Sequence, residues 1–434
     1  MVYHHLAFTG DSFVVVVVVK SAIFLFPHHT LYSDTSQILL LLIIIMRRAL
    51  AGACARRRLA RRLPPRAQKG VVSSSSSSSF TSFSREDNGG DDSKTEYFST
   101  TTLKDNLIKA DFRYAAALLR QRDYETYLCT CAVDASKRAV PLALRALNCE
   151  TAIIDVVHNH SGENTSAALM KLKWWHDRID ETVRPSAPVQ LDHPIARCVR
   201  AALASSRSSH SKWEAEVSSS NDDVGTTLTT TTGWSSTRRW VQWLKRAIEA
   251  RMEDVAKGSR VFDSMSELER FAKETHGHFL LVTLDAENVR STASDHVASH
   301  VGTAIGLTNS LRGAKIHARN RKTYFPMDVL ATENLSAETV YDGGIGDERV
   351  KNAAHKVASA AVGHIAAARR IYIENKLVEK YPHMAKLLLQ ATTAERWLEK
   401  LEKYDFDVFR EELQRTPRLM TQARVFLSAW KNQF

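Results

Sequence analysis

Residues 298–329 read ASHVGTAIGLTNSLRGAKIHARNRKTYFPMDV, and this stretch decides the fold. Val297, just before this stretch, begins a series of positions that advance by four, three, four and three residues. The series continues through Val301, Ala304, Thr308 and Leu311. This spacing places all five residues in one stripe along a helix. A basic loop and a Tyr-x-Pro turn follow. The stretch therefore predicts one long helix with a single packed face, closed by a loop.

The same periodicity continues through most of the chain after residue 106. One stripe consists of Ala394, Trp397, Leu398 and Leu401, and another of Val357, Ala361, His364, Ala368 and Ile371. Alternating runs bounded by hairpin turns are scarce there, so residues 106–434 predict an all-α domain. Residues 205–236 break the pattern, because they are rich in Ser and Thr and poor in large apolar groups. We expect them to form a disordered insertion between two helices.

The charge of the chain is concentrated at its start. Residues 1–85 hold 11 of the 59 Lys and Arg residues but two of the 48 acidic residues, Asp11 and Asp34. Residues 86–434 are therefore close to neutral, although the whole chain carries +11. A neutral body gives no support to nucleic-acid binding, and we expect no nucleic-acid partner.

Residues 46–85 have the composition of a targeting signal. They read MRRALAGACARRRLARRLPPRAQKGVVSSSSSSSFTSFSR, with many arginines, a serine run and no acidic residue. This composition is typical of a mitochondrial transit peptide, and the alternative is a basic disordered arm that contacts nucleic acid. Residues 86–105 are polar and predict a linker.

Residues 1–45 fit no such signal. The runs Val14–Val19 and 38–45 are each too short to span the roughly 30 Å core of a bilayer. No basic residue precedes Val14, as a secretory signal would require. We interpret Met46 as the true start, with residues 1–45 as a doubtful upstream extension within a disordered N-terminus.

The helix of the opening stretch resembles the second signature of the squalene/phytoene synthase family, G-x-x-x-Q-x-T-N-x-x-R-D-x-x-E-D, followed by a basic loop and Y-x-P. The frame is kept by Gly302, Thr308, Asn309, Arg312, Arg321, Tyr324 and Pro326. The acidic positions are occupied by Gly313, Ile316 and His317, and the usual Gln by Gly306. The resemblance implies an isoprenoid-synthase-like helical bundle.

The first signature of the family, Y-A-F-C-R-x-x-D-D-x-x-D, is also changed. Arg138 lies where the family opens this helix, and the acids then fall on Ala152, Ile153 and Val156. Asp155 is one place out of register, and a slip of one residue would put it on the last acid. In these synthases the acids hold Mg²⁺, which neutralises the departing pyrophosphate. We therefore expect no metal, no cofactor, no catalytic residue and no ordinary prenyl transfer.

Other residues offer weak alternatives for metal binding. His296 and His300 are spaced i, i+4, which can place two imidazoles on one metal, but no third ligand accompanies them. His276 and His278 are separated by two residues, and we interpret them as helix-end or surface residues.

A basic cluster follows the second signature and comprises Arg312, Lys315, Arg319, Arg321 and Lys322. It has two interpretations. One is a retained contact with pyrophosphate or an anionic lipid, and the other is a solvated surface with an Arg–acid pair that holds the loop. The candidate residues of a vestigial pocket or anion site are Arg138, Asp155, Thr308, Asn309, Arg312, Arg321 and Tyr324.

Four further matches resemble a non-catalytic branch of the same family. Three are DYETYLCT at 123–130, ALRALNCETA at 143–152 and Asp295–Gly302. The fourth is the C-terminal tail, with its two elements 404–409 and 426–430. The branch implies a non-enzymatic mitochondrial protein, in the matrix or at the matrix face of the inner membrane, that assists assembly of complex I (NADH:ubiquinone oxidoreductase). The expected partners are complex I subunits or assembly intermediates, with a lipid or isoprenoid ligand and peripheral inner-membrane contact as further expectations.

Two rival functions remain open at this point. One is an active squalene/phytoene synthase-type prenyltransferase with an atypical metal site. The other is a lipid carrier.

Overall fold

The structure, a computed structural model, describes residues 2–9, 12–19, 22–27, 100–158, 163–184, 191–219, 231–258, 260–414 and 418–434. The chain divides into two compact units, Met1–Phe98 and Ser99–Phe434. The predicted transit peptide (46–85) lies outside the described residues, as does most of the predicted linker (86–105). Both stay predictions, and so does the expected disorder of those N-terminal residues.

The first unit contains a three-stranded antiparallel sheet, with strands in the order β1 (Val2–Thr9), β2 (Ser12–Val19) and β3 (Ala22–Pro27). Val2 pairs with Val19, and Val14 pairs with Pro27. Strands were not predicted for these residues. A run of six β-branched valines in β2 favours extended backbone, which accounts for them.

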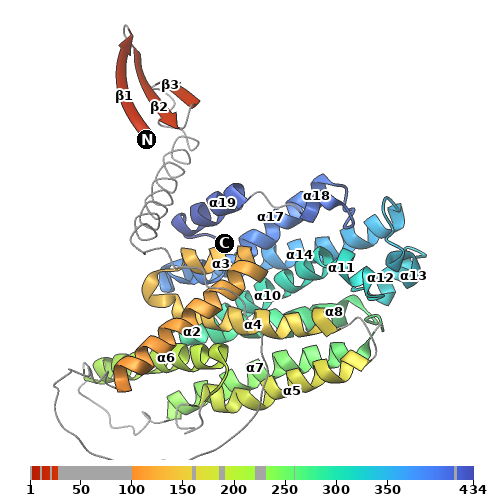
Figure 1. The fold of residues 1–434 in the computed structure, drawn as a ribbon, viewed down its shortest axis with the longest axis horizontal. Helices are drawn as coiled ribbons and strands as arrows, with labels where there is room; N and C mark the ends of the chain where they lie inside the picture. Colours follow the sequence, from red (N-terminus) through yellow and green to blue (C-terminus); the bar gives the residue numbers. More distant parts are fainter. Residues whose placement is uncertain are drawn as a thin grey trace, which may run out of the picture. The chain divides into compact units, whose positions relative to one another are not determined.

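The second unit is built of helices, as predicted, and Figure 1 shows them as one bundle. Its elements are α2 (Thr100–Arg122), α3 (Tyr124–Ala132), the 3₁₀ turn η2 (Ala135–Lys137), α4 (Ala139–His158), α5 (Glu163–Val183), α6 (Pro194–Ser219), α7 (Thr231–Lys257), α8 (Met265–Ala272), the π turn η3 (Lys273–Gly277), α9 (His278–Ala286), α10 (Thr292–Arg312), α11 (Ala314–Arg319), α12 (Met327–Thr332), α13 (Ala337–Tyr341), α14 (Glu348–Glu374), α15 (Leu377–Lys380), α16 (Met384–Leu387), α17 (Gln390–Lys403), α18 (Glu411–Gln414) and α19 (Arg418–Trp430). Within the described ranges, none of the helices is both long and apolar enough to cross a bilayer.

The segment 205–236, predicted as a disordered insertion, is helical at both ends. Helix α6 continues to Ser219 and α7 begins at Thr231. Residues 220–230 lie outside the described part of the chain, so the predicted insertion stays a prediction there.

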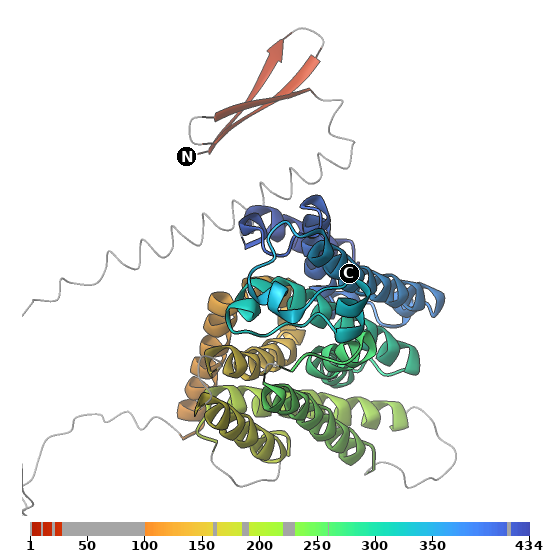
Figure 2. The same ribbon diagram turned by 90° about the vertical axis from the view of Figure 1, so that its right-hand side faces the viewer.

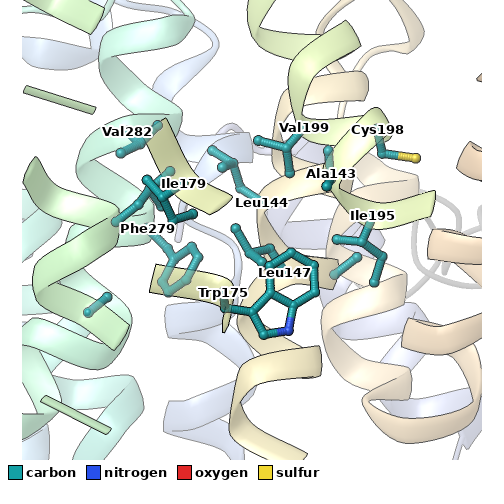
Figure 3. Packing of buried hydrophobic residues seen from close by; sticks show 14 of the residues in the cluster. Ala143, Leu144, Leu147, Trp175, Ile179, Ile195, Cys198, Val199, Phe279 and Val282 are labelled. Carbon is teal, nitrogen blue, oxygen red and sulfur yellow. The ribbon is translucent and has the colours of Figure 1, made fainter. Parts of the chain in front are cut away.

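One hydrophobic core fills the space between α4, α5, α6 and α9. Figure 3 shows Leu144 and Leu147 of α4 facing Ile179 of α5, Val199 of α6 and Phe279 of α9. A second core surrounds the C-terminal half of α10 and includes Trp397 and Leu401 of the predicted α17 stripe. Because α10 packs on α8, η3, α9, α14 and α17, it lies at the centre of this half of the bundle.

Helix α10 forms as the opening stretch predicts. Ser291 and Ser294 make a capping box that satisfies the first backbone amides. Val297, Val301 and Leu311 of the predicted stripe are buried. Residues 301–308 are all buried as well, so α10 is enclosed on every side and the prediction of a single packed face was wrong.

Two glycines allow α10 to approach the π turn closely. A Cβ atom at Gly302 would lie 2.2 Å from Gly277 Cα, and one at Gly306 would lie 2.5 Å from Ala272 Cβ. Gly306 occupies the position where the resembled signature has Gln. The backbone of α8 and η3 therefore fills the space that a side chain would need at this point.

This contact predicts the effect of adding one methyl group. Gly302→Ala should lower the free energy of unfolding by about 1–3 kcal/mol, because the new Cβ must push two helices apart. Urea unfolding followed by circular dichroism measures it. Gly363→Ala on α14 is the control, since its Cβ meets nothing within 4 Å and should stabilise the helix by about 0.5–1 kcal/mol. Equal stability of Gly302→Ala and the wild type would refute the close packing.

Candidate functional site

The positions of the missing acids lie on α4, at Gly313 after the end of α10, and on α11. Ala152 and Ile153 are half-buried, whereas the side chains of Asp155 and Val156 lie outside the described residues. At the second signature, Ile316 is 45% exposed. His317 lies against Gly313, where a Cβ atom would be 2.4 Å from the ring Nε2, and its ring packs edge-on against Tyr324 at 4.7 Å.

A chain of polar groups links the two signature helices through α7 and the π turn. Arg251 of α7 donates a hydrogen bond from Nη2 to Asn148 Oδ1 at 2.6 Å, and Asn148 lies one helical turn before Ala152 on α4. The same Nη2 lies 3.5 Å from the carbonyl oxygen of Thr275. In the next residue, His276 Nε2 lies 3.2 Å from Asn309 Nδ2 of α10. The region between the signature helices is thus occupied by a guanidinium, an imidazole and two amides.

The electrostatics of this chain favour a neutral histidine. Burial, together with the nearby Arg251 cation, lowers the pKa of His276 to about 3. The imidazole is therefore uncharged at neutral pH, and the donor Asn309 Nδ2 requires that Nε2 accept. Burial likewise lowers the pKa of Arg145, which lies three residues before Asn148 and donates to the carbonyl oxygen of Leu387 at 2.6 Å.

A pocket of about 320 Å³ opens beside Arg312, the last residue of α10. Arg312 pairs with Glu125 of α3 at 2.9 Å and stacks over Trp397 of α17 at 5.5 Å. The lining combines both signs of charge and comprises Arg122, Asp123, Tyr124, Glu125, Arg312, Trp397, Leu413, Gln414 and Thr421. This pocket receives polar rather than apolar groups.

Two further cations, Arg396 and Lys400, lie on α17 close to this pocket. Arg396 donates to the Thr421 hydroxyl at 2.8 Å, and Lys400 donates to the carbonyl oxygen of Glu412. Burial lowers the pKa of Lys400, and the neighbouring Arg396 and Arg312 cations lower it further. The Nε atom of Arg312 is buried and has no hydrogen-bond partner. The carboxylates of Glu125, Glu399 and Glu412 lie among these cations and offset part of their charge.

The basic loop after α11 is held by buried and exposed ion pairs. Lys322 and Tyr324 both donate to Asp254 Oδ2 of α7 at 2.8 Å, and all three side chains are buried. At the surface, Arg321 pairs with Glu338 at 2.6 Å.

Four of the five cations in the basic cluster therefore have acidic partners, since Lys315 pairs with Glu411 at 3.3 Å and Arg312 with Glu125. The geometry favours the interpretation in which ion pairs hold the loop.

The remaining candidate residues do not converge on one pocket. Arg138 donates to the carbonyl oxygens of Cys131 and Val133 at 2.9 Å, so it closes the end of α3. The buried Thr308 hydroxyl donates to Ala304 of its own helix at 2.7 Å. Arg321 lines a separate surface pocket with Glu338 and Tyr341.

The i, i+4 spacing of His296 and His300 is not used for a shared pair in the structure. The Nδ1 atom of His300 instead lies 2.8 Å from Nδ1 of His364 on α14. His276 is half-buried within the π turn that joins α8 to α9, so its interpretation as a helix-end or surface residue was wrong. Among the side chains that the structure describes, no three His, Cys, Asp or Glu residues are grouped closely enough to hold a metal.

Comparison with known proteins identifies the family. The family model of squalene/phytoene synthases matches residues 119–430, which is most of the chain. The chain belongs to the squalene/phytoene synthase family. A crystal structure of a dehydrosqualene synthase with bound ligand has the same fold, with a TM-score of 0.50, 14% identity, and coverage of 76% of this chain and 99% of that one.

Three curated relatives carry one name, complex I assembly factor 6. The protein from Bos taurus is 27% identical over 325 residues, covering 74% of this chain and 83% of its own length. The one from Homo sapiens is 27% identical over 321 residues, with 74% and 82% covered. That from Dictyostelium discoideum, described as a homologue of the factor, is 26% identical and covers 75% and 78%.

The polar contacts of Asn148, Arg251 and Asp254 in this squalene/phytoene synthase fold were not predicted from the sequence. A signal for two of them exists, because Arg251 and Asp254 interrupt the stripe of α7 that Leu244, Ile248 and Val255 bury. A charged residue at a buried helical position requires a partner. Sequence alone does not reveal which partner, since these contacts span up to 103 residues.

The neutral His276 predicts a pH dependence of stability. Its pKa is about 3 in the folded chain and about 6.5 when unfolded, so the unfolded chain binds a proton first as pH falls. The free energy of unfolding should therefore decrease below pH 6.5, by up to about 1.4 kcal/mol per pH unit from this residue. His276→Gln should flatten the curve between the two pKa values. The exposed His296→Gln is the control, and equal slopes for both variants would contradict the assignment.

Proposed function

We propose that this chain is a non-enzymatic assembly factor for mitochondrial complex I that acts in the matrix or at the matrix face of the inner membrane. In this proposal the synthase scaffold binds a partner subunit or a lipid instead of catalysing prenyl transfer. The names of the curated relatives support the role in assembly. The Arg-rich, acid-free segment 46–85 supports the mitochondrial location.

The polar chain between the signature helices carries the non-enzymatic part of the proposal. Head-to-head prenyl synthases need carboxylates to hold Mg²⁺ beside the diphosphate. Here Arg251 lies between the helices and His276 is neutral. A guanidinium within about 5 Å of a divalent cation costs on the order of several kcal/mol at an effective dielectric constant of about 20. The region between the signature helices therefore disfavours binding of the Mg²⁺ that prenyl transfer needs.

The pocket beside Arg312 supports a ligand-binding variant of the same proposal. Its Arg122 and Arg312 side chains could bind a phosphate or carboxylate headgroup of a lipid or isoprenoid if the headgroup displaced Glu125 from Arg312. Binding such a headgroup requires no metal and no bond cleavage.

Removal of the gene should lower assembled complex I, and a plasmid copy should restore it. The Asp155→Asn protein should restore complex I to the same level as the wild-type protein. The reason is that the proposed role does not use the carboxylate of Asp155, which remains beside the first signature. Blue-native gels and NADH oxidation by isolated mitochondria measure the outcome. Gly302→Ala, at its reduced stability, controls for lost protein, with abundance followed by immunoblot. Failure of a normally abundant Asp155→Asn protein to restore the complex would indicate residual acid chemistry.

Purified protein should release no pyrophosphate from farnesyl or geranylgeranyl diphosphate in the presence of Mg²⁺. An active dehydrosqualene synthase in the same assay is the positive control. Turnover above the background without protein, lost in Asp155→Asn, would establish the rival prenyltransferase function.

A further inference from the structure

Helix α19 exposes large apolar side chains on its outer face. Its inner face buries Thr421, Val425 and Ala429. Its outer face is more apolar, with Leu419 exposed to 63%, Met420 to 65% and Trp430 to 60%. At 100° per residue, Ala423 and Leu427 lie on this same outer face, so five apolar residues form one stripe along the helix.

The orientation of α19 is fixed by its inner contacts. Val425 and Ala429 pack in a small core with Leu128 and Cys129 of α3. Gln422 Nε2 donates to the Tyr124 hydroxyl at 2.5 Å, and Arg424 pairs with Glu399 and Glu395 of α17. The helix cannot turn its apolar stripe inward without losing these contacts. In Figures 1 and 2 the helix, in dark blue, lies at the edge of the bundle.

The terminal segment is basic in sequence. Residues 413–434 contain Arg415, Arg418, Arg424 and Lys431 and no acidic side chain, although Arg424 is paired with Glu395 and Glu399 of α17 and Glu411 and Glu412 precede the segment. Lys431 is exposed at the end of the apolar stripe, next to Trp430. A surface helix with Leu, Met and Trp outward and cations at its rim has the composition of an interfacial helix on anionic lipid.

We propose that the outer face of α19 docks on an anionic lipid surface. Apolar side chains enter the boundary between headgroups and acyl chains, Trp430 lies at the headgroup level, and the exposed Lys431 contacts lipid phosphates. A second copy of the chain is a poorer occupant, since two acid-free cationic segments would repel each other. The proposal identifies the surface for the membrane-side location in the proposed function and rests on that location for its biological setting.

The test uses the full chain with vesicles of phosphatidylcholine, with and without phosphatidylglycerol. Hydrogen–deuterium exchange is measured peptide by peptide, so protection of α19 is separated from any effect of the Arg-rich segment 46–85. Anionic vesicles should slow exchange within residues 418–434 more than neutral vesicles, and added salt should reduce the effect. Unchanged exchange in these residues on anionic vesicles would overturn the proposal.

Variants assign the effect to the stripe. Leu419→Ser with Met420→Ser should require about tenfold more anionic vesicle for half-maximal protection of α19, which corresponds to about 1.4 kcal/mol. Ile373→Ser on α14 is the matched control, because Ile373 is exposed to 70% and lies on another helix. Both variants should keep the wild-type circular dichroism. Equal responses of the two variants would overturn the proposal.

Further outcomes distinguish the other occupants and the proposed function. Lipid-free dimerisation in analytical ultracentrifugation that the double variant abolishes would assign the stripe to a second copy. Protection by lipid-free matrix extract but not by vesicles would assign it to a protein. Either result overturns the proposal. These measurements need no complex I, so their failure leaves the gene-removal experiment to decide the proposed function separately.

Discussion

The close approach of α10 to the π turn is the constraint on which the middle of the domain depends. Gly302 and Gly306 let the helix backbone meet Gly277 and Ala272 with no room for a side chain. This approach brings Asn309 within reach of His276. It also fixes the end of α10, so that Arg312 reaches Glu125 on α3. The polar chain and the pocket both follow from one helix contact.

The same contact bears on the proposal that this chain does not catalyse prenyl transfer. A synthase of this family must keep space and negative charge between its two signature helices. In this chain Gly306 removes a side chain, the neighbouring backbone fills the space, and Arg251 adds positive charge. Both features support the proposal that the chain does not catalyse prenyl transfer, because a diphosphate–metal complex needs space and negative charge.

The sequence predicted the helical fold well where a repeating stripe governs packing. The stripes of α10 and α17 are buried as expected, because a 3.6-residue period specifies one face directly. The π turn was not predictable, since one extra residue inside a helical run leaves the apolar pattern almost unchanged. The strands of residues 2–27 were not predicted, although the β-branched valines of β2 favour extended backbone. Of the candidate site residues, Asn309 and Arg312 lie near the cleft and pocket. Arg138 and Thr308 make local hydrogen bonds that spacing alone does not reveal.

Helix α7 carries two buried charges three residues apart, and they serve different neighbours. Arg251 reaches the first signature helix and the π turn, while Asp254 anchors Lys322 and Tyr324 of the loop. Residues at this spacing move together when a helix rotates about its axis. A substitution that shifts α7 would therefore disturb its contact with the first signature helix and its contact with the basic loop together. One helix thus links the position of α4 to that of the loop after α11.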